Sequence, residues 1–134
     1  MEKPKVLVID DDPDLVESVR ITLEANNYEV FSAENGTEGL RMVKETHPDL
    51  IILDVMMDTI TEGFHVSYRL RSRDPNSEYR KYSNIPILML TGISQKTHMK
   101  FSHKQDEDYL PVDDFMEKPI RLEALLERVK KLIT

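Results

Sequence analysis

Three carboxylates, one hydroxyl and one ammonium group stand at the ends of short apolar runs in this sequence. Asp10 and Asp11 follow KVLVI, and Asp54 follows DLIIL. Thr91 follows IPILML, and Lys118 comes shortly after the run DFM. Carboxylates brought together repel one another, and a hard divalent cation with oxygen ligands relieves that repulsion. The three acids therefore predict a magnesium site, provided that the fold gathers the ends of these runs.

Such a site would support phosphoryl transfer to a carboxylate. A carboxylate beside Mg²⁺ is able to attack a phosphoryl group and form an aspartyl phosphate. The negative charge on the phosphoryl oxygens then needs a hydrogen-bond donor and a second cation as well as the metal. Thr91 and Lys118 are residues of these two types.

The apolar runs are typical of strands that are buried on both faces. Strands are expected at residues 5–9, 28–32, 49–53, 85–90 and 114–116. Serial strands and helices indicate a parallel sheet with helices on both faces, and in such sheets sites form beyond the carboxyl ends of the strands. All five candidate residues therefore belong to one edge of the sheet.

Helical patterns lie between the runs. Asp12 is expected to cap the first helix, with Pro13 in its first turn. Further helices are expected over residues 37–46, around Val66 and Leu70, and along the apolar stripe of residues 122–132. The polar stretch from residue 74 to 84 is expected to be a loop or a frayed helix end.

Four motifs carry a resemblance to a known family. VLVIDDDP, LIILDVMM, ILMLTG and FMEKP, in this order, resemble the receiver domain of two-component response regulators over residues 4–132. The resemblance implies an α/β fold with a doubly wound five-stranded parallel sheet in the flavodoxin-like order 2-1-3-4-5. It also leads us to expect one receiver domain over residues 1–134, with no effector domain in this chain.

The resemblance assigns a role to each candidate residue. Asp54 would be the phosphoacceptor and a metal ligand. Asp11 would bind Mg²⁺ directly, and Asp10 would assist directly or through water. Met56 would give its backbone carbonyl to the metal. Lys118 would pair with the phosphoryl group, and its bond to the following proline is typically cis in the family.

Two further residues are expected to move when the domain is phosphorylated. Thr91 would be the switch hydroxyl, and Phe115 stands where the family has its switch aromatic. Phe115 is equally well explained as a core residue, because aromatic side chains are mostly buried for packing. The donor would be a phosphohistidine on a sensor histidine kinase or phosphotransfer protein. A downstream protein would bind the fourth helix, fifth strand and fifth helix.

Composition excludes several other classes. The chain has 134 residues, no cysteine and a net charge of −7, so cysteine nucleophiles and thiolate metal sites are ruled out. Its apolar runs are far shorter than the ~20 residues of a membrane helix, and we expect no secretory signal. An acidic chain is not expected to hold nucleic acid by itself. We expect a cytoplasmic protein.

Two stretches depart from the family pattern. Asp58 stands where the family usually has proline, and Gly63 comes one residue later than expected, which indicates a rebuilt loop after Asp54. The segment of residues 94–112 is longer than usual. We expect it to influence the choice of partner.

Two other functions remain open from sequence. A degenerate receiver would bind partners without phosphorylation. An aspartyl-phosphate phosphatase of the haloacid-dehalogenase type would use Asp10 as its nucleophile, but Pro13 stands where that family has threonine or valine. The identity of the phosphorylated residue separates these readings, since only the switch uses Asp54.

Overall fold

The fold is built on a central parallel sheet of five strands. The computed structural model describes residues 3–54, 66–67, 69–72, 74–92 and 112–133. The strands are β1 (Lys5–Ile9), β2 (Glu29–Ala33), β3 (Leu50–Asp54), β4 (Ile87–Thr91) and β5 (Asp114–Glu117). Their order is β2-β1-β3-β4-β5, and every pair is parallel. The predicted order and fold class are confirmed.

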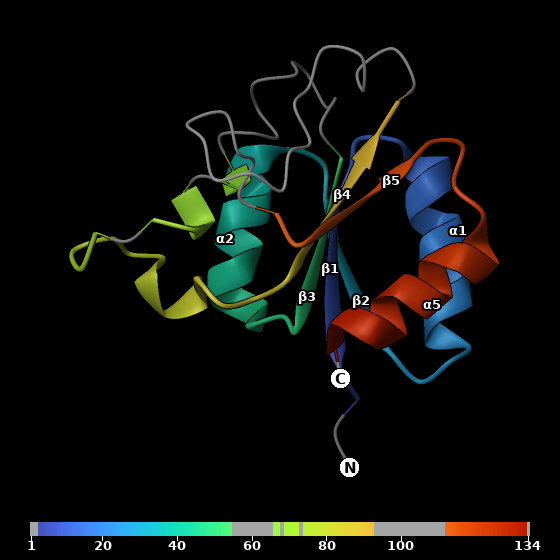
Figure 1. Ribbon diagram of the computed structural model, residues 1–134, viewed down its shortest axis with the longest axis horizontal. Helices are drawn as coiled ribbons and strands as arrows, with labels where there is room; N and C mark the ends of the chain where they lie inside the picture. The colour runs from blue at the N-terminus through green and yellow to red at the C-terminus, as the bar shows by residue number, and fades with distance from the viewer. Residues whose placement is uncertain (1–2, 55–65, 68, 73, 93–111, 134) are drawn as a thin grey trace.

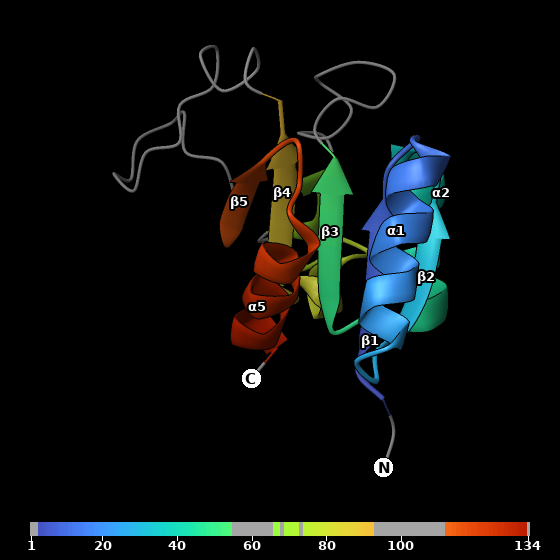
Figure 2. The same cartoon turned by 90° about the vertical axis from the view of Figure 1, so that its right-hand side faces the viewer.

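Helices cover both faces of the sheet (Figure 1). The helix α2 (Gly36–Thr46) lies on one face, while α1 (Pro13–Glu24) and α5 (Leu122–Ile133) lie together on the other. Figure 2 shows the sheet from the side of α1 and α5, with the strands pointing away from the N-terminus. All carboxyl ends of the strands therefore meet at one edge.

Alternate residues of each strand enter two separate apolar cores, because successive side chains of a strand point to opposite faces. The core under α2 contains Leu7 and Ile51, whereas the core under α1 and α5 contains Val8 and Ile52. These four side chains are completely buried. Burial on both faces explains why the sequence shows continuous apolar runs here.

The first helix begins where the sequence predicts. The side chain of Asp12 accepts hydrogen bonds from the backbone N–H groups of Asp14 and Leu15, and Pro13 occupies the first turn. Val19 and Leu23 are the residues of this helix whose side chains are buried.

The second helix begins one residue earlier than predicted. The side chain of Asn35 caps it by accepting from the backbone N–H of Glu38 at 2.8 Å, so that Gly36 is already helical. Gly39 lies against β1, because a Cβ atom built there would stand 2.5 Å from Cδ1 of Ile9. Because Gly39 has no Cβ atom, the helix is able to approach the sheet closely.

Several strand limits differ from the expected ones for identifiable reasons. The backbone N–H of Tyr28 still donates to the carbonyl of Leu23, so β2 starts one residue later than expected. Asp54 pairs with Leu90 of β4, which extends β3 by one residue. Likewise, Thr91 pairs with Glu117, so β4 and β5 both run further than expected.

The stretch before β4 is more ordered than its polar sequence suggests. It contains the short 3-10 helix η1 (Arg80–Tyr82). Tyr79 and Tyr82 are 6% and 4% exposed and join the core under α2, as do Val66 and Leu70. Among the described residues, no helix is long and apolar enough to cross a membrane.

Candidate functional site

The carboxyl edge of the sheet brings three acids together. Asp10 directly follows β1, and Asp54 is the last residue of β3. One carboxylate oxygen each from Asp10, Asp11 and Asp54 lies within 4.8 Å of the other two. Asp10 and Asp54 are 2% and 1% exposed, whereas Asp11 is exposed. The proximity that the sequence predicts is present in the structure.

Lys118 lies between the two buried carboxylates. Its Nζ atom is 3.3 Å from Oδ1 of Asp54 and 3.5 Å from Oδ2 of Asp10. The backbone N–H of Lys118 donates to the carbonyl of Thr91 at 2.6 Å, which fixes the lysine to the end of β4. The Lys118–Pro119 peptide bond is cis, as the resemblance implies. The two carboxylates thus share one ammonium group.

Burial is the main influence on the charge of Asp10. It raises the pKa of this carboxyl from its ordinary value of 3.8 to about 6, and the neighbouring charge of Asp54 adds to the increase. Two groups act in the opposite direction. The backbone N–H of Asp12 donates to Oδ1 of Asp10 at 2.9 Å, and the ammonium group of Lys118 attracts the carboxylate. Asp10 therefore ionises at a free-energy cost.

At Lys118 the neighbouring charges, rather than burial, decide the direction of the pKa shift. Burial lowers the pKa of its ammonium group, but the charges of Asp54 and Asp10 outweigh burial and raise the pKa overall. The lysine is consequently held in its charged form. One ammonium group still faces two carboxylates and a third acid at Asp11, so negative charge remains in excess.

These residues fit a magnesium ion. Mg²⁺ prefers hard oxygen ligands and binds through a small number of carboxylates while keeping several waters. The cluster offers carboxylate oxygens alone, and two of its members are buried where negative charge is costly. A divalent cation would offset that cost. Asp10, Asp11 and Asp54 are the described residues that could hold it.

Thr91 is the last residue of β4, directly after Leu90, the partner of Asp54, and Phe115 lies on the neighbouring strand β5. Thr91 is fully buried, and its hydroxyl donates to the carbonyl of Met116 at 3.5 Å. Phe115 is partly buried and packs against the core under α2. Both remain candidates for the switch. The packing of Phe115 also agrees with the alternative that it is a core residue.

Several predicted features lie outside the described residues. They are the metal-binding carbonyl of Met56, the departures at Asp58 and Gly63, and residues 93–111 of the lengthened segment. Their roles remain predictions.

Sequence reasoning missed the ion pairs that fix β5, the strand leading to Lys118. The guanidinium group of Arg71 pairs with Asp113, directly before the strand, and also donates to the carbonyl of Ser83 at 2.8 Å. Arg128 of α5 pairs with Asp114 at 2.6 Å. These contacts join segments far apart in the sequence, and no local pattern signals them.

Comparison with known proteins agrees with this geometry. The family model described as the response regulator receiver domain matches residues 6–130. Among curated proteins, the chain is 37% identical over 130 residues to the "DNA-binding dual master transcriptional regulator RpaA" of Synechocystis sp., covering 97% of this chain and 49% of that protein. It is 35% identical over 129 residues to the response regulator MprA of Mycobacterium leprae, and the match covers 96% of this chain and 50% of that protein.

A solved structure shows the same fold. The chemotaxis response regulator CheY4 of Vibrio cholerae superposes with a TM-score of 0.76 and 30% identity, covering 97% of this chain and 98% of that one. The chain spans about half the length of the curated relatives it matches. One of them is named as DNA-binding, so the comparisons do not support the expectation that nucleic acid plays no part.

The match covers nearly the whole chain and includes all the candidate residues that the structure describes. Receiver domains are signalling switches of two-component systems, rather than enzymes that turn over a separate substrate. This chain belongs to the response regulator receiver domain family.

Proposed function

We propose that this chain is a phosphorylatable receiver, in which Asp54 accepts a phosphoryl group in a magnesium-dependent reaction. The donor is a phosphohistidine of a sensor histidine kinase or a histidine phosphotransfer protein. One observation carries the proposal: Asp54 lies in a cluster with Asp10 and Asp11, and Lys118 is within 3.3 Å of its carboxylate. Residues 1–134 act as one receiver domain under this proposal, and the exchange takes place in the cytoplasm.

The reaction exchanges one bond to phosphorus for another. A carboxylate oxygen of Asp54 attacks the phosphorus atom and forms the new O–P bond. The P–N bond to the donor imidazole breaks, and the nitrogen keeps the electron pair. When bound, Mg²⁺ supplies positive charge that offsets the charge on the phosphoryl oxygens. Asp10, Asp11, Asp54 and the carbonyl of Met56 would hold it.

Lys118 prepares the site for the incoming charge. Its ammonium group is already placed by the two buried carboxylates, and the backbone of Thr91 fixes its position in the chain. Phosphorylation converts the Asp54 carboxylate into an acyl phosphate, a mixed anhydride, and places new negative oxygens beside it. Lys118 then pairs with a phosphoryl oxygen, which is a charge-assisted contact stronger than a neutral one.

Phosphorylation would shift a pre-existing equilibrium between two conformations. The hydroxyl of Thr91 would turn from the carbonyl of Met116, its 3.5 Å partner, toward the phosphoryl group. Phe115 would move in concert. Because β5 and α5 are joined by the Arg128–Asp114 ion pair, a change at this strand reaches the surface where a downstream protein would bind.

Intact mass measurement tests the proposal. The wild-type chain is incubated with a small phosphodonor such as acetyl phosphate, with and without Mg²⁺. We expect one phosphate adduct that requires Mg²⁺ and is lost in Asp54→Asn. Asp12→Asn is the matched control, because it removes the same charge close to the site and asparagine still caps the helix. An adduct that persists in Asp54→Asn would refute the proposal, and failure of every donor would favour a degenerate receiver.

A further inference from the structure

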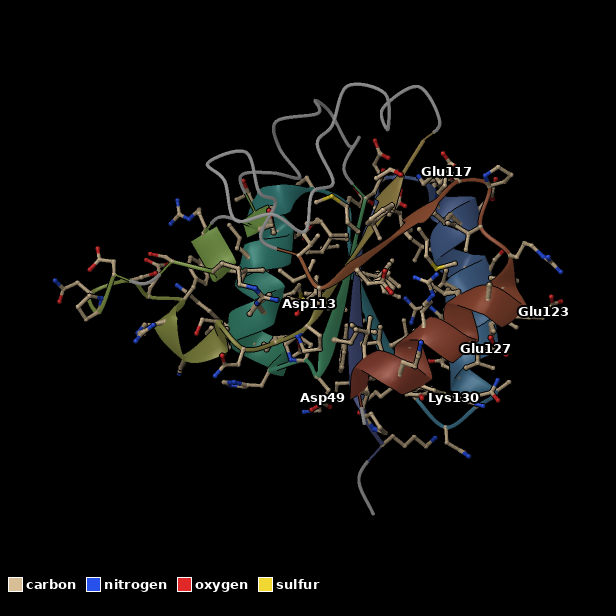
Figure 3. The ribbon with its side chains drawn as sticks, viewed as in Figure 1. Asp49, Asp113, Glu117, Glu123, Glu127 and Lys130 are labelled. Atoms are coloured by element: carbon tan, nitrogen blue, oxygen red, sulfur yellow. The ribbon has the colours of Figure 1, made fainter. Side chains whose placement is uncertain are left out.

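The two ends of the central sheet carry different groups of side chains. The carboxyl edge carries the acidic cluster of Asp10, Asp11 and Asp54. The opposite edge, where the strands begin, carries Lys3, Lys5, His47 and Asp49 around one hollow. Further along this edge, β2 begins at Glu29 and β5 at Asp114. A five-residue strand separates the two edges by about 16 Å, at ~3.3 Å per residue. Figure 3 shows Asp49 at this lower end of the molecule and Glu117 at the other.

A hollow lies at the lower end, and we call it the basal hollow. Its lining residues are Lys3, Pro4, Lys5, His47, Asp49 and Ile133. It is open to solvent and has a volume of about 370 Å³, within the range of ~300–1,000 Å³ that is usual for small-molecule sites. The hollow is thus large enough for a small organic or inorganic anion.

Hydrogen bonds hold the floor of the basal hollow in place. The backbone N–H of Lys5 donates to Oδ2 of Asp49 at 2.8 Å, and the backbone N–H of Asp49 donates to the carbonyl of Lys5 at 2.7 Å. The ammonium group of Lys5 lies 3.3 Å from the carbonyl of Thr46, to which it donates. Since an ammonium group has three donors, this contact leaves capacity for an anion.

The imidazole of His47 is positioned by a different set of contacts. His47 ends α2 in a left-handed conformation with φ of 50°. Its ring lies 5.5 Å from the ring of Tyr82, and the ammonium group of Lys81 lies 5.2 Å from that same tyrosine ring. Tyr82 is buried, so the imidazole rests on a fixed support. The edge of the hollow is therefore ordered before any ligand arrives.

The charges in the basal hollow favour an anion. Among the lining residues, two lysine ammonium groups face a single aspartate, whose carboxylate already accepts a backbone hydrogen bond. One carboxylate is too few for a divalent cation, which takes several oxygen ligands. Lysine ammonium groups recognise phosphate as point charges, and a polyphosphate would engage more than one of them.

We propose that the basal hollow binds a polyphosphate group, at a site separate from the candidate phosphorylation site. The polyphosphate is either inorganic or part of a nucleotide, since both present the same chain of anionic oxygens. Lys3 and Lys5 contact those oxygens, and His47 closes the other edge of the site.

Calorimetric titration tests this proposal on the full chain in magnesium-free buffer. Inorganic tripolyphosphate is the first probe and ATP the second. We expect saturable binding of tripolyphosphate, weakened about tenfold or more by Lys3→Glu, because the reversed charge repels the polyanion. His47→Gln should also weaken binding. Asp54→Asn should leave binding unchanged, which separates this site from the carboxyl edge.

Arg121→Glu is the matched control for Lys3→Glu. It makes the same charge reversal at a side chain that is 82% exposed and lies outside the basal hollow. Equal weakening by both variants would show a general charge effect and overturn the proposal, as would the absence of binding to the wild type. Tighter binding of ATP than of tripolyphosphate would identify a nucleotide site. Equal or weaker binding of ATP would identify an inorganic polyphosphate site.

Discussion

Replacing Asp10 with asparagine should stabilise the metal-free protein. Burial raises the pKa of this carboxyl to about 6 from 3.8, so ionisation is more costly in the folded chain than in the unfolded one. Because the pKa of Asp10 is higher in the folded state than in the unfolded state, its protonated form favours folding. This contribution to stability is complete below pH 3.8, the ordinary pKa, and is lost as the pH rises through about 6, the pKa in the folded state. Wild-type stability should therefore fall over this interval because of Asp10.

The expected size of the effect follows from the pKa difference. A difference of about 2 pKa units, at about 1.4 kcal/mol per unit, gives about 3 kcal/mol at pH 8. About half of this loss of stability should be present at pH 5, because the carboxyl is then mostly protonated in the folded state but mostly ionised in the unfolded state. Asparagine keeps an oxygen that is able to accept from the backbone N–H of Asp12, so this local contact is not lost. The free energy of unfolding of Asp10→Asn should thus exceed that of the wild type by up to about 3 kcal/mol at pH 8.

Urea unfolding with EDTA measures this difference at several pH values between 5 and 8. Asp12→Asn is the control, because it removes a neighbouring charge from an exposed helix cap, and its stability difference should not follow the same pH dependence. Saturating Mg²⁺ should stabilise the wild type by about 2.7 kcal/mol at 100 times its dissociation constant, and the variant by less. If Asp10→Asn is equal to or less stable than the wild type at pH 8 without metal, the reasoning about burial is wrong.

Three further substitutions test the packing and the site. Gly39→Ala should destabilise the protein by about 1–3 kcal/mol in urea unfolding, since its Cβ would meet Ile9 at 2.5 Å; an unchanged midpoint would contradict the close approach of α2. Leu125→Ala should cost about 2–5 kcal/mol because its side chain is fully buried, and a loss below 1 kcal/mol would show that the core collapses around it. Lys118→Met should raise the pKa of Asp10 further, because one attracting charge is removed; titration of the carboxyl by NMR checks this, and an unchanged or lower pKa would refute it.

The convergence of the acidic residues could be predicted because parallel strands end at one edge of a sheet. Each apolar run marked a strand, and the residue type after each run marked the edge. Strand limits were less accurate at Tyr28 and Asp54, because pairing with a neighbouring strand or helix end decides them. The order of the strands came from the family resemblance, as no local pattern specifies it.

The parts that could not be predicted depend on contacts between distant segments. Tyr79 and Tyr82 belong to a polar stretch, and only the core under α2 explains their burial. The pairing of Arg71 with Asp113 joins residues 42 positions apart. Likewise, the basal hollow forms where the start of β1, the end of α2 and the end of α5 meet. Such features follow from tertiary packing rather than from periodicity.

Locating the phosphorylated residue tests the central claim most directly. The chain is incubated with acetyl phosphate and Mg²⁺ and then reduced with borohydride, which converts an aspartyl phosphate to homoserine. Peptide mass mapping then identifies the modified position. We predict homoserine at position 54 alone. Modification at Asp10 would contradict the account and favour the phosphatase reading, and modification at any other acid would show that the cluster at the carboxyl edge does not select Asp54.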